Sequence, residues 1–243
     1  MYSKIPMPQV EWNKENMKYA LCFFPVIGVI IGGLSWIVGG FLLDGDCGKI
    51  LFAVIMTLLP VVITGGIHLD GFMDTVDAIS AYGDREKRLA ILKDSHAGAF
   101  SLLYLCCYFL ACLGFWSEVS KDMLPVLAGG YVLSRALSGF SVVSFKAARD
   151  SGLAKTFQEG ANRLSTRIVM IFFILAAVLW IVANSVVIGG TVVLMAGLIF
   201  IYYRLMAMKQ FGGITGDLAG YFLQLCELAM LIGVVLAGGI LWK

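Results

Sequence analysis

The sequence predicts an all-α protein that crosses a membrane about seven times. Of its 243 residues, 60% are hydrophobic and only 14% are charged, whereas soluble domains carry about 25% charged residues. The apolar residues form long runs, and runs of about 20 such residues are typical of transmembrane helices. The runs lack the alternation of barrel strands, and backbone groups in lipid must be paired within the segment. We expect one integral membrane domain over residues 1–243.

Seven apolar runs predict the seven helices. They cover residues 19–43, 49–67, 97–116, 123–145, 168–183, 186–203 and 218–242. Pro25 and Pro60 lie inside the first two runs and predict kinks there. Gly28 and Gly32 form a GxxxG pair in the first run, which favours close packing of two helices. The boundary between the fifth and sixth runs depends on two polar residues at 184–185.

The basic residues are distributed unequally between the connecting segments, and this predicts the orientation. Fourteen of the 18 lysines and arginines lie on one side of a seven-helix topology, and three lie on the other side. By the positive-inside rule, the N-terminus is cytoplasmic and the C-terminus is outside. The polar segments 68–96, 146–167 and 204–217 then face the cytoplasm. We expect the protein in the cell (plasma or inner) membrane, and the net charge of +2 gives no indication of nucleic-acid binding.

Three acids follow the second run at spacings of four and three residues. On a helix, Asp70, Asp74 and Asp77 lie within about 60° of one another. Such a face offers the oxygen ligands that Mg²⁺ uses together with substrate phosphates, and Asp94 or Asp217 are candidates to complete the metal site. The alternatives are a solvated acidic face, or Asp70 as the N-cap of a helix.

Basic residues occur in the same predicted cytoplasmic segments as the acids. Arg88 and Lys93 are candidates for contacts with a polyphosphate, because cationic groups neutralise phosphate oxygens, and Ser95 is a third candidate beside them. The glycine-rich residues 212–217 would let backbone amides approach an anion. No GxxxxGK[ST] motif follows a predicted strand, so the chain is not a P-loop protein.

Two ionisable residues, Arg135 and Glu227, lie inside apolar runs, where such residues are costly and usually functional. They could form a structural ion pair, or they could line a polar cavity open to the cytoplasm. Gln224 and Glu227 continue the helical face of Asp217 over an arc of about 80°, which favours the cavity. Arg135 and Gln224 are then candidates for substrate contacts. His68 and Glu227 are the candidate bases and, with Asp74, the catalytic candidates.

The cysteines give no indication of a disulfide framework or a zinc site. None of the six forms a CxxC pair, and five of them lie within apolar runs. They are interpreted as small hydrophobic residues buried in the membrane. The first 18 residues contain several charges and two prolines, which is not the pattern of a cleavable signal peptide.

Taken together, these motifs resemble those of the cobalamin synthase family (adenosylcobinamide-GDP ribazoletransferase, cobalamin 5′-phosphate synthase). The resemblance rests on GGIHLDGFMDTVD at 65–77, on RL at 88–89, on KDS at 93–95 and on GGITGD at 212–217. Residues 24–28 and 134–135, and the pair Gln224 and Glu227, are also similar to that family. One departure is Phe72-Met73, where the family more often has Leu-Ala.

The resemblance implies a Mg²⁺-dependent phosphotransferase that joins adenosylcobinamide-GDP to α-ribazole, or to α-ribazole 5′-phosphate, and releases GMP. A ribose hydroxyl would attack the cobinamide-side phosphorus. A homo-oligomer is compatible with the sequence. A CDP-alcohol phosphotransferase is a rival, but no AR pair follows Asp70-Gly71 at the distance its motif requires. A transporter is a second rival, but it would more usually show internal repeats, and the two halves show none.

Overall fold

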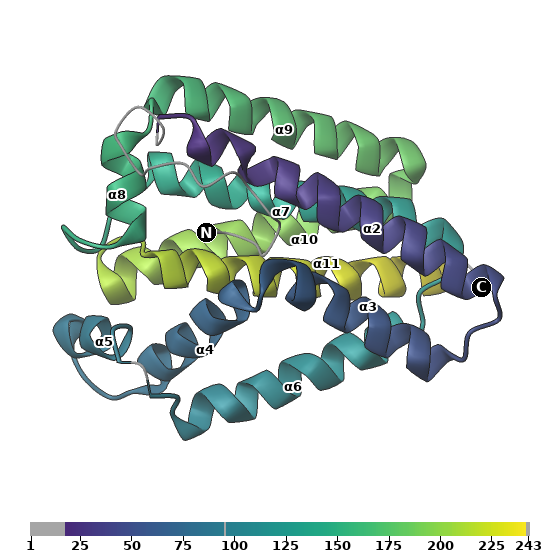
Figure 1. Ribbon diagram of the computed structural model, residues 1–243, viewed down its shortest axis with the longest axis horizontal. Coiled ribbons are helices and arrows are strands. Elements are labelled where there is room, and N and C mark those ends of the chain that lie inside the picture. The colour runs from purple at the N-terminus through teal and green to yellow at the C-terminus, as the bar shows by residue number, and fades with distance from the viewer. Residues whose placement is uncertain (1–17, 95, 242–243) are drawn as a thin grey trace.

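Every regular element of the chain is a helix within residues 18–94 and 96–241, the residues that the computed structural model describes (Figure 1). The helices are α2 (Phe24–Asp44), α3 (Lys49–Thr64), α4 (Ile67–Ser80), α5 (Arg85–Ile91), α6 (Ala99–Trp116), α7 (Leu124–Ser144), α8 (Leu153–Gly160), α9 (Arg163–Asn184), α10 (Val186–Met206) and α11 (Gly216–Leu241). Shorter turns are η1 (Ala20–Phe23), η2 (Lys121–Met123) and the π-helical η3 (Ala207–Phe211). The all-α prediction is confirmed.

Six helical segments of the described chain are long and apolar enough to cross a membrane: Ala20–Asp44, Ala99–Trp116, Lys121–Ser144, Arg163–Asn184, Val186–Phe211 and Gly216–Gly239. Helices α3 and α4 meet the same criteria as a pair, but the chain bends by 95° between them. The number of spans is therefore six, or seven if the bent pair is one span, which confirms the prediction of about seven. The orientation of the two termini stays a prediction.

The second predicted span ends earlier than the apolar run suggested, because two glycines redirect the chain. Gly65 and Gly66 have φ angles of 69° and 80°, in the left-handed region that glycine adopts without steric cost. Helix α3 ends at Thr64, and α4 begins at Ile67. The acidic motif therefore lies on its own helix, at an angle of 95° to α3.

The two prolines differ in their effect. Pro60 lies inside α3, and the Thr64 hydroxyl donates to its carbonyl oxygen at 2.8 Å. Pro25 lies in the first turn of α2, where its missing N–H breaks no helical hydrogen bond. Pro25 therefore stands at the start of α2 and not in its interior, and a kink there stays a prediction.

Helix α7 lies at the centre of the bundle. In the most apolar 18-residue window of the segment that contains α7, 83% of the residues are buried. The corresponding share is 17% for α6 and 22% for α9. It packs against α2, α9 and α11 (Figure 1). A Cβ atom on Gly28 or Gly32 of α2 would lie within 2.5 Å of a backbone oxygen of α7. The GxxxG pair thus packs two helices closely, as the sequence predicts.

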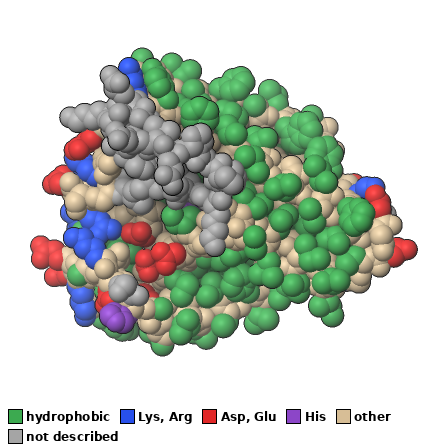
Figure 2. All heavy atoms as spheres, viewed as in Figure 1, with side chains coloured by type: hydrophobic (Ala, Val, Ile, Leu, Met, Phe, Trp, Pro, Cys, Tyr) green, Lys and Arg blue, Asp and Glu red, His purple; other side chains and the backbone are tan. Residues whose placement is uncertain are grey.

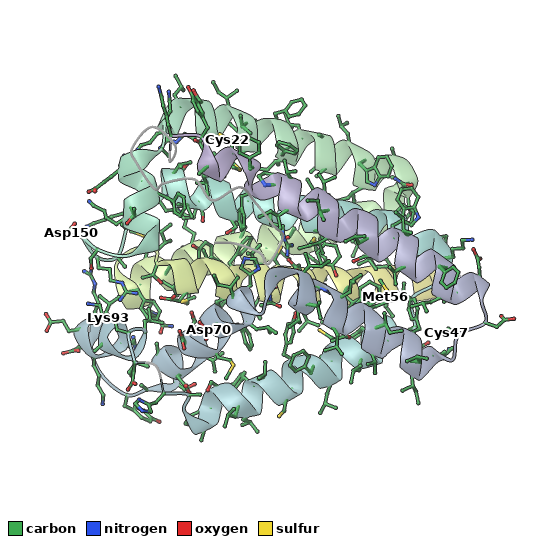
Figure 3. The ribbon with its side chains drawn as sticks, in the orientation of Figure 1. Cys22, Cys47, Met56, Asp70, Lys93 and Asp150 are labelled. Carbon is green, nitrogen blue, oxygen red and sulfur yellow. The ribbon has the colours of Figure 1, made fainter. Side chains whose placement is uncertain are left out.

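An apolar surface surrounds the bundle, and charged side chains gather at its two ends (Figure 2). Large side chains such as Phe41 and Val186 are 78% and 74% exposed, as expected of helices that face lipid. More of the charges lie at the end formed by α5, α8 and the start of α11. Figure 3 places Lys93 and Asp150 at this end, and Cys47 at the opposite end. All six cysteines are free.

Candidate active site

Helix α4 carries the three motif acids, and Figure 3 shows Asp70 in the half of the bundle that ends at Lys93 and Asp150. Gly66 is its N-cap residue, and Asp70 lies in the first turn. The alternative in which Asp70 caps the helix is therefore wrong. Asp70 is exposed, whereas Asp74 and Asp77 are half-buried. The exposure of the acids thus decreases from Asp70 to Asp74 and Asp77.

Helix α11 approaches α4 closely at two glycines. A Cβ atom on Gly71 would lie 2.8 Å from the backbone oxygen of Asp217, and one on Gly220 would lie 3.1 Å from the backbone oxygen of His68. A Cβ atom on Gly71 would force the two backbones apart, and one on Gly220 would be a tight contact, so glycine favours the close approach at both positions. As a result Asp217 reaches the α4 acids, and Asp74 interacts electrostatically with Asp70, Asp217 and Asp77.

The carboxylate of Asp77 also fixes the start of the next span. Its Oδ2 accepts a hydrogen bond from the Gly98 N–H at 2.6 Å, and its Oδ1 accepts one from the Ser101 N–H at 2.9 Å. These N–H groups belong to the first turn of α6 and its N-cap, which have no partner within that helix. Asp77 therefore caps α6 from a distant position in the sequence.

Asp94, the fifth acid of the predicted metal site, lies apart from the other four in its contacts. Its Oδ1 accepts hydrogen bonds from the Nδ1 of His96 at 2.7 Å and from the His96 N–H at 3.0 Å. These bonds hold the pKa of Asp94 below its usual value. Asp94 is exposed and is not among the groups that act electrostatically on Asp74.

The acids are neighbours without forming a closed ligand set. Among the described residues, no three His, Cys, Asp or Glu side chains are arranged closely enough to hold a metal ion. Mg²⁺ usually keeps several waters and takes one or two carboxylates together with substrate phosphates. Asp70, Asp74 and Asp217 would fit such an open site, because Asp74 interacts electrostatically with the other two carboxylates.

A cation that the sequence did not predict pairs with one of these acids. Arg149 donates from Nη2 to the Oδ2 of Asp217 at 3.2 Å, and both side chains are partly buried. A second missed residue, Arg85, donates to the backbone oxygen of Ala148 at 2.7 Å, and its guanidinium packs against Gly212. The sequence showed only that both belong to basic segments, because their partners are more than 60 residues away.

The predicted diphosphate contacts lie on and beside α5, which packs against α4 and η3. Arg88 is half-buried, and its Nε is buried without a hydrogen-bond partner. Lys93 is exposed at the charged end of the molecule (Figure 3). Ser95 lies outside the described residues.

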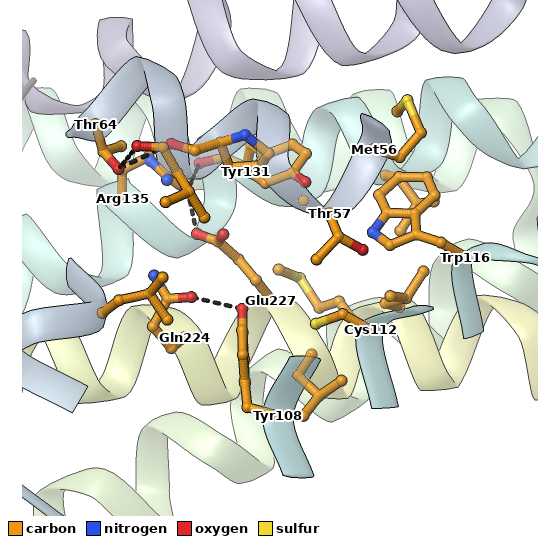
Figure 4. A pocket seen from close by; sticks show the side chains of 18 residues that line it. Met56, Thr57, Thr64, Tyr108, Cys112, Trp116, Tyr131, Arg135, Gln224 and Glu227 are labelled. Carbon is orange, nitrogen blue, oxygen red and sulfur yellow. Dashed lines mark hydrogen bonds and ion pairs between the residues drawn. The ribbon is translucent and has the colours of Figure 1, made fainter. Parts of the chain in front are cut away.

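Deeper in the bundle, Arg135 and Glu227 form an ion pair (Figure 4). Arg135 is 1% exposed, and the Glu227 side chain is 11% exposed. Ser134 donates to the same Glu227 carboxylate at 3.2 Å. The ion-pair alternative is confirmed. Both members of the pair also line a cavity of about 40 Å³, whereas a cavity open to the cytoplasm stays a prediction. Gln224 lines this cavity too, and it accepts a hydrogen bond from Tyr108 at 2.5 Å.

His68 lies in the first turn of α4, two residues before Asp70. It is 5% exposed, its ring contacts Phe24 edge-on at 6.0 Å, and neither ring nitrogen has a hydrogen-bond partner. Buried polar groups are nearly always paired. An unpaired imidazole next to an acidic cluster is therefore a candidate for contact with a reacting group.

The fold and this site define a polytopic membrane protein with a polar site of carboxylates and cations at one end of its helices. A family model described as cobalamin-5-phosphate synthase matches residues 1–235. The chain belongs to the cobalamin-5-phosphate synthase family. Its resemblance to that family, predicted from the motifs, is confirmed.

Individual relatives agree with this assignment. Proteins named adenosylcobinamide-GDP ribazoletransferase are 45% identical in Lachnoclostridium phytofermentans, over 99% of this chain and 92% of the relative, and 35% identical in Clostridium perfringens strain 13, over 97% and 95%. A protein of the same name in Geobacillus sp. strain WCH70 is 33% identical over 89% of this chain and 84% of its own length. No solved structure matches the chain.

Proposed function

We propose that this protein is an adenosylcobinamide-GDP ribazoletransferase. It joins adenosylcobinamide-GDP to α-ribazole or α-ribazole 5′-phosphate and releases GMP. The observation that carries the proposal is the contact between α4 and α11 in a chain of this family. This contact brings Asp217 into electrostatic interaction with Asp74, which also interacts with Asp70, and Asp217 is paired with Arg149.

In the proposed reaction, the ribose hydroxyl oxygen of the acceptor attacks the cobinamide-side phosphorus. A new P–O bond forms, the P–O bond to GMP breaks, and the hydroxyl proton passes to a base. Phosphoryl transfer of this kind depends mainly on positioning and on neutralising charge. Arg88 and Lys93 would contribute to this by contacting the diphosphate, as proposed from the sequence.

Mg²⁺ is the proposed cofactor. Asp70, Asp74 and Asp217 would hold it, and Asp77 would add negative charge while it caps α6. When bound, the ion would neutralise the diphosphate and the departing GMP. The same charge would relieve the repulsion between the carboxylates that the packing of α4 on α11 brings together.

Of the two candidate bases, His68 is favoured over Glu227. The ring nitrogens of His68 have no partner, so a neutral imidazole could accept the proton from the hydroxyl. The Glu227 carboxylate is engaged by Arg135 and Ser134. We assign Glu227 to positioning: it ties α11 to α7 beneath the site.

The site is proposed to face the cytoplasm of a cell whose plasma or inner membrane holds the protein. The argument is the excess of basic residues on the predicted cytoplasmic segments. A cytoplasmic site would also be reached directly by the nucleotide-bearing substrates.

The direct test uses purified protein with adenosylcobinamide-GDP and either acceptor, in Mg²⁺ or in excess EDTA. GMP and the corrinoid product are measured together. Release of both in Mg²⁺ alone is the expected result. Absence of GMP with both acceptors would reject the proposed activity, and full activity in EDTA would reject the metal. The GMP readout also separates this enzyme from a transporter, and the acceptor separates it from a CDP-alcohol phosphotransferase.

A further inference from the structure

A second cavity lies at the charged end of the molecule, outside the residues predicted from the sequence to bind substrate. Its volume is about 210 Å³. It lies between α8 and the start of α11, and its polar lining consists of Arg149, Ser151, Lys155, Thr215 and Asp217. It is smaller than the roughly 300–1,000 Å³ pockets of drug-sized ligands. Such a space suits a small polar group of a larger substrate.

Two distant backbone segments close this cavity on one side. The Ala148 N–H donates to Ile214 at 2.9 Å, and the Ile214 N–H donates to Lys146 at 2.8 Å. A Cβ atom on Gly213 would lie 2.5 Å from the Lys146 oxygen, so this close pairing requires glycine there. The pairing fixes Arg149 opposite the first turn of α11.

The lining offers an anion three kinds of favourable group. Arg149 is partly buried and held over the cavity by Asp217. The Lys155 ammonium lies 3.5 Å from Asp150 and 3.4 Å from Glu159. Both of these acids are exposed, so the pairs are weak and Lys155 is free to turn to a stronger partner. The cavity also borders the N-terminal turn of the 26-residue helix α11, whose N–H groups favour anions.

From this lining we infer that the cavity is a subsite for a substrate phosphate group, gripped by Arg149 and Lys155. The inference rests on the proposed function, because it assigns a place to one of the phosphates of that reaction. Asp217 belongs both to the cavity lining and to the acidic cluster. A phosphate in the cavity would therefore lie directly beside the carboxylates proposed to hold Mg²⁺.

Two substrates could supply this phosphate, namely the 5′-phosphate of the acceptor or the diphosphate of the donor. Steady-state kinetics of Lys155→Gln and Arg149→Gln distinguish them. Loss of a charge-assisted hydrogen bond is expected to raise the relevant KM roughly tenfold to a hundredfold. If the acceptor phosphate occupies the subsite, KM rises for α-ribazole 5′-phosphate and not for α-ribazole. If the donor occupies it, KM for adenosylcobinamide-GDP rises with either acceptor.

The matched control is Lys146→Gln, which removes one exposed positive charge from the same segment outside the cavity lining. It is expected to leave each KM within about twofold of wild type. Equal KM values for wild type, Lys155→Gln and Arg149→Gln would overturn the inference, and so would an equal rise in the control. Arg149→Lys, which keeps the charge, separates lost binding from lost folding, and its KM should lie between wild type and Arg149→Gln.

A binding measurement keeps the inference independent of the enzymatic activity. Inorganic phosphate is the probe, and the thermal unfolding midpoint of the purified protein in detergent is the readout. Phosphate should raise the midpoint of wild type and Lys146→Gln, but not that of Lys155→Gln. The same shift in all three proteins, or none in wild type, would overturn the subsite even if GMP release is observed. A selective shift without GMP release would support the subsite and reject only the proposed reaction.

Discussion

Replacing Glu227 by glutamine tests the most deeply buried charges in the described bundle. The substitution removes the negative charge with little change of volume, and it leaves the guanidinium of Arg135, which is 1% exposed, without a compensating charge. Breaking a buried ion pair by removing one partner typically costs about 3–5 kcal/mol. For a chain of this length, that corresponds to a fall of roughly 10 °C in the thermal unfolding midpoint.

The assay is thermal unfolding in detergent, followed by circular dichroism, for Glu227→Gln, Arg135→Gln and the double variant. Because the double variant leaves no unpaired charge, it should recover at least half of the stability lost by Glu227→Gln, and the coupling free energy follows from the cycle. The control is Glu118→Gln, an exposed residue whose Lys49 partner lies 3.9 Å away. It should change stability by less than about 1 kcal/mol.

Two results would refute this reasoning. An unchanged unfolding midpoint in Glu227→Gln would show that the pair contributes no stability. A double variant as unstable as the sum of the two singles would show that Arg135 and Glu227 do not interact. Turnover measured on the same proteins separates the two roles of Glu227: lost turnover at unchanged stability would place this carboxylate in the reacting site.

Three further predictions concern the site and its orientation. Asp74→Asn should abolish GMP release in a folded protein, whereas Asp122→Asn, at an exposed acid remote from the α4 cluster, should not; equal activity in both would reject the metal assignment. Gly71→Ala should separate α4 from α11 and lower turnover at least tenfold, because its Cβ would lie 2.8 Å from a backbone oxygen; the control Gly33→Ala has nothing within 4 Å and should be neutral. A membrane-impermeant thiol reagent should label Cys47 in intact cells, and labelling only after lysis would reverse the orientation.

Local sequence patterns determined the helices and the composition of their faces. The length of each apolar run predicted a helix, because a segment in lipid must pair its own backbone groups. The spacing of Asp70, Asp74 and Asp77 placed three carboxylates on one face of α4, because side-chain direction follows from helical periodicity alone. Gly28 and Gly32 predicted a close helix contact for the same reason.

Contacts between distant segments were decided only by the tertiary structure. The proximity of Asp217 to α4 depends on the close packing at Gly71 and Gly220. The pairing of Arg149 with Asp217 depends on a backbone bridge between two loops. No periodicity connects such positions, because their separation in space is set by how whole helices pack.

The sequence also could not show which residues have a structural role in addition to the role predicted for them. It marked Asp77 as one of three equivalent acids, whereas the structure uses its carboxylate to cap α6. It offered a structural pair or a cavity open to the cytoplasm for Arg135 and Glu227; the structure shows the pair, whose two members also line a small cavity. Residue type and spacing specify which groups are available, but hydrogen-bond partners depend on which unpaired backbone and side-chain groups the folded chain brings within reach.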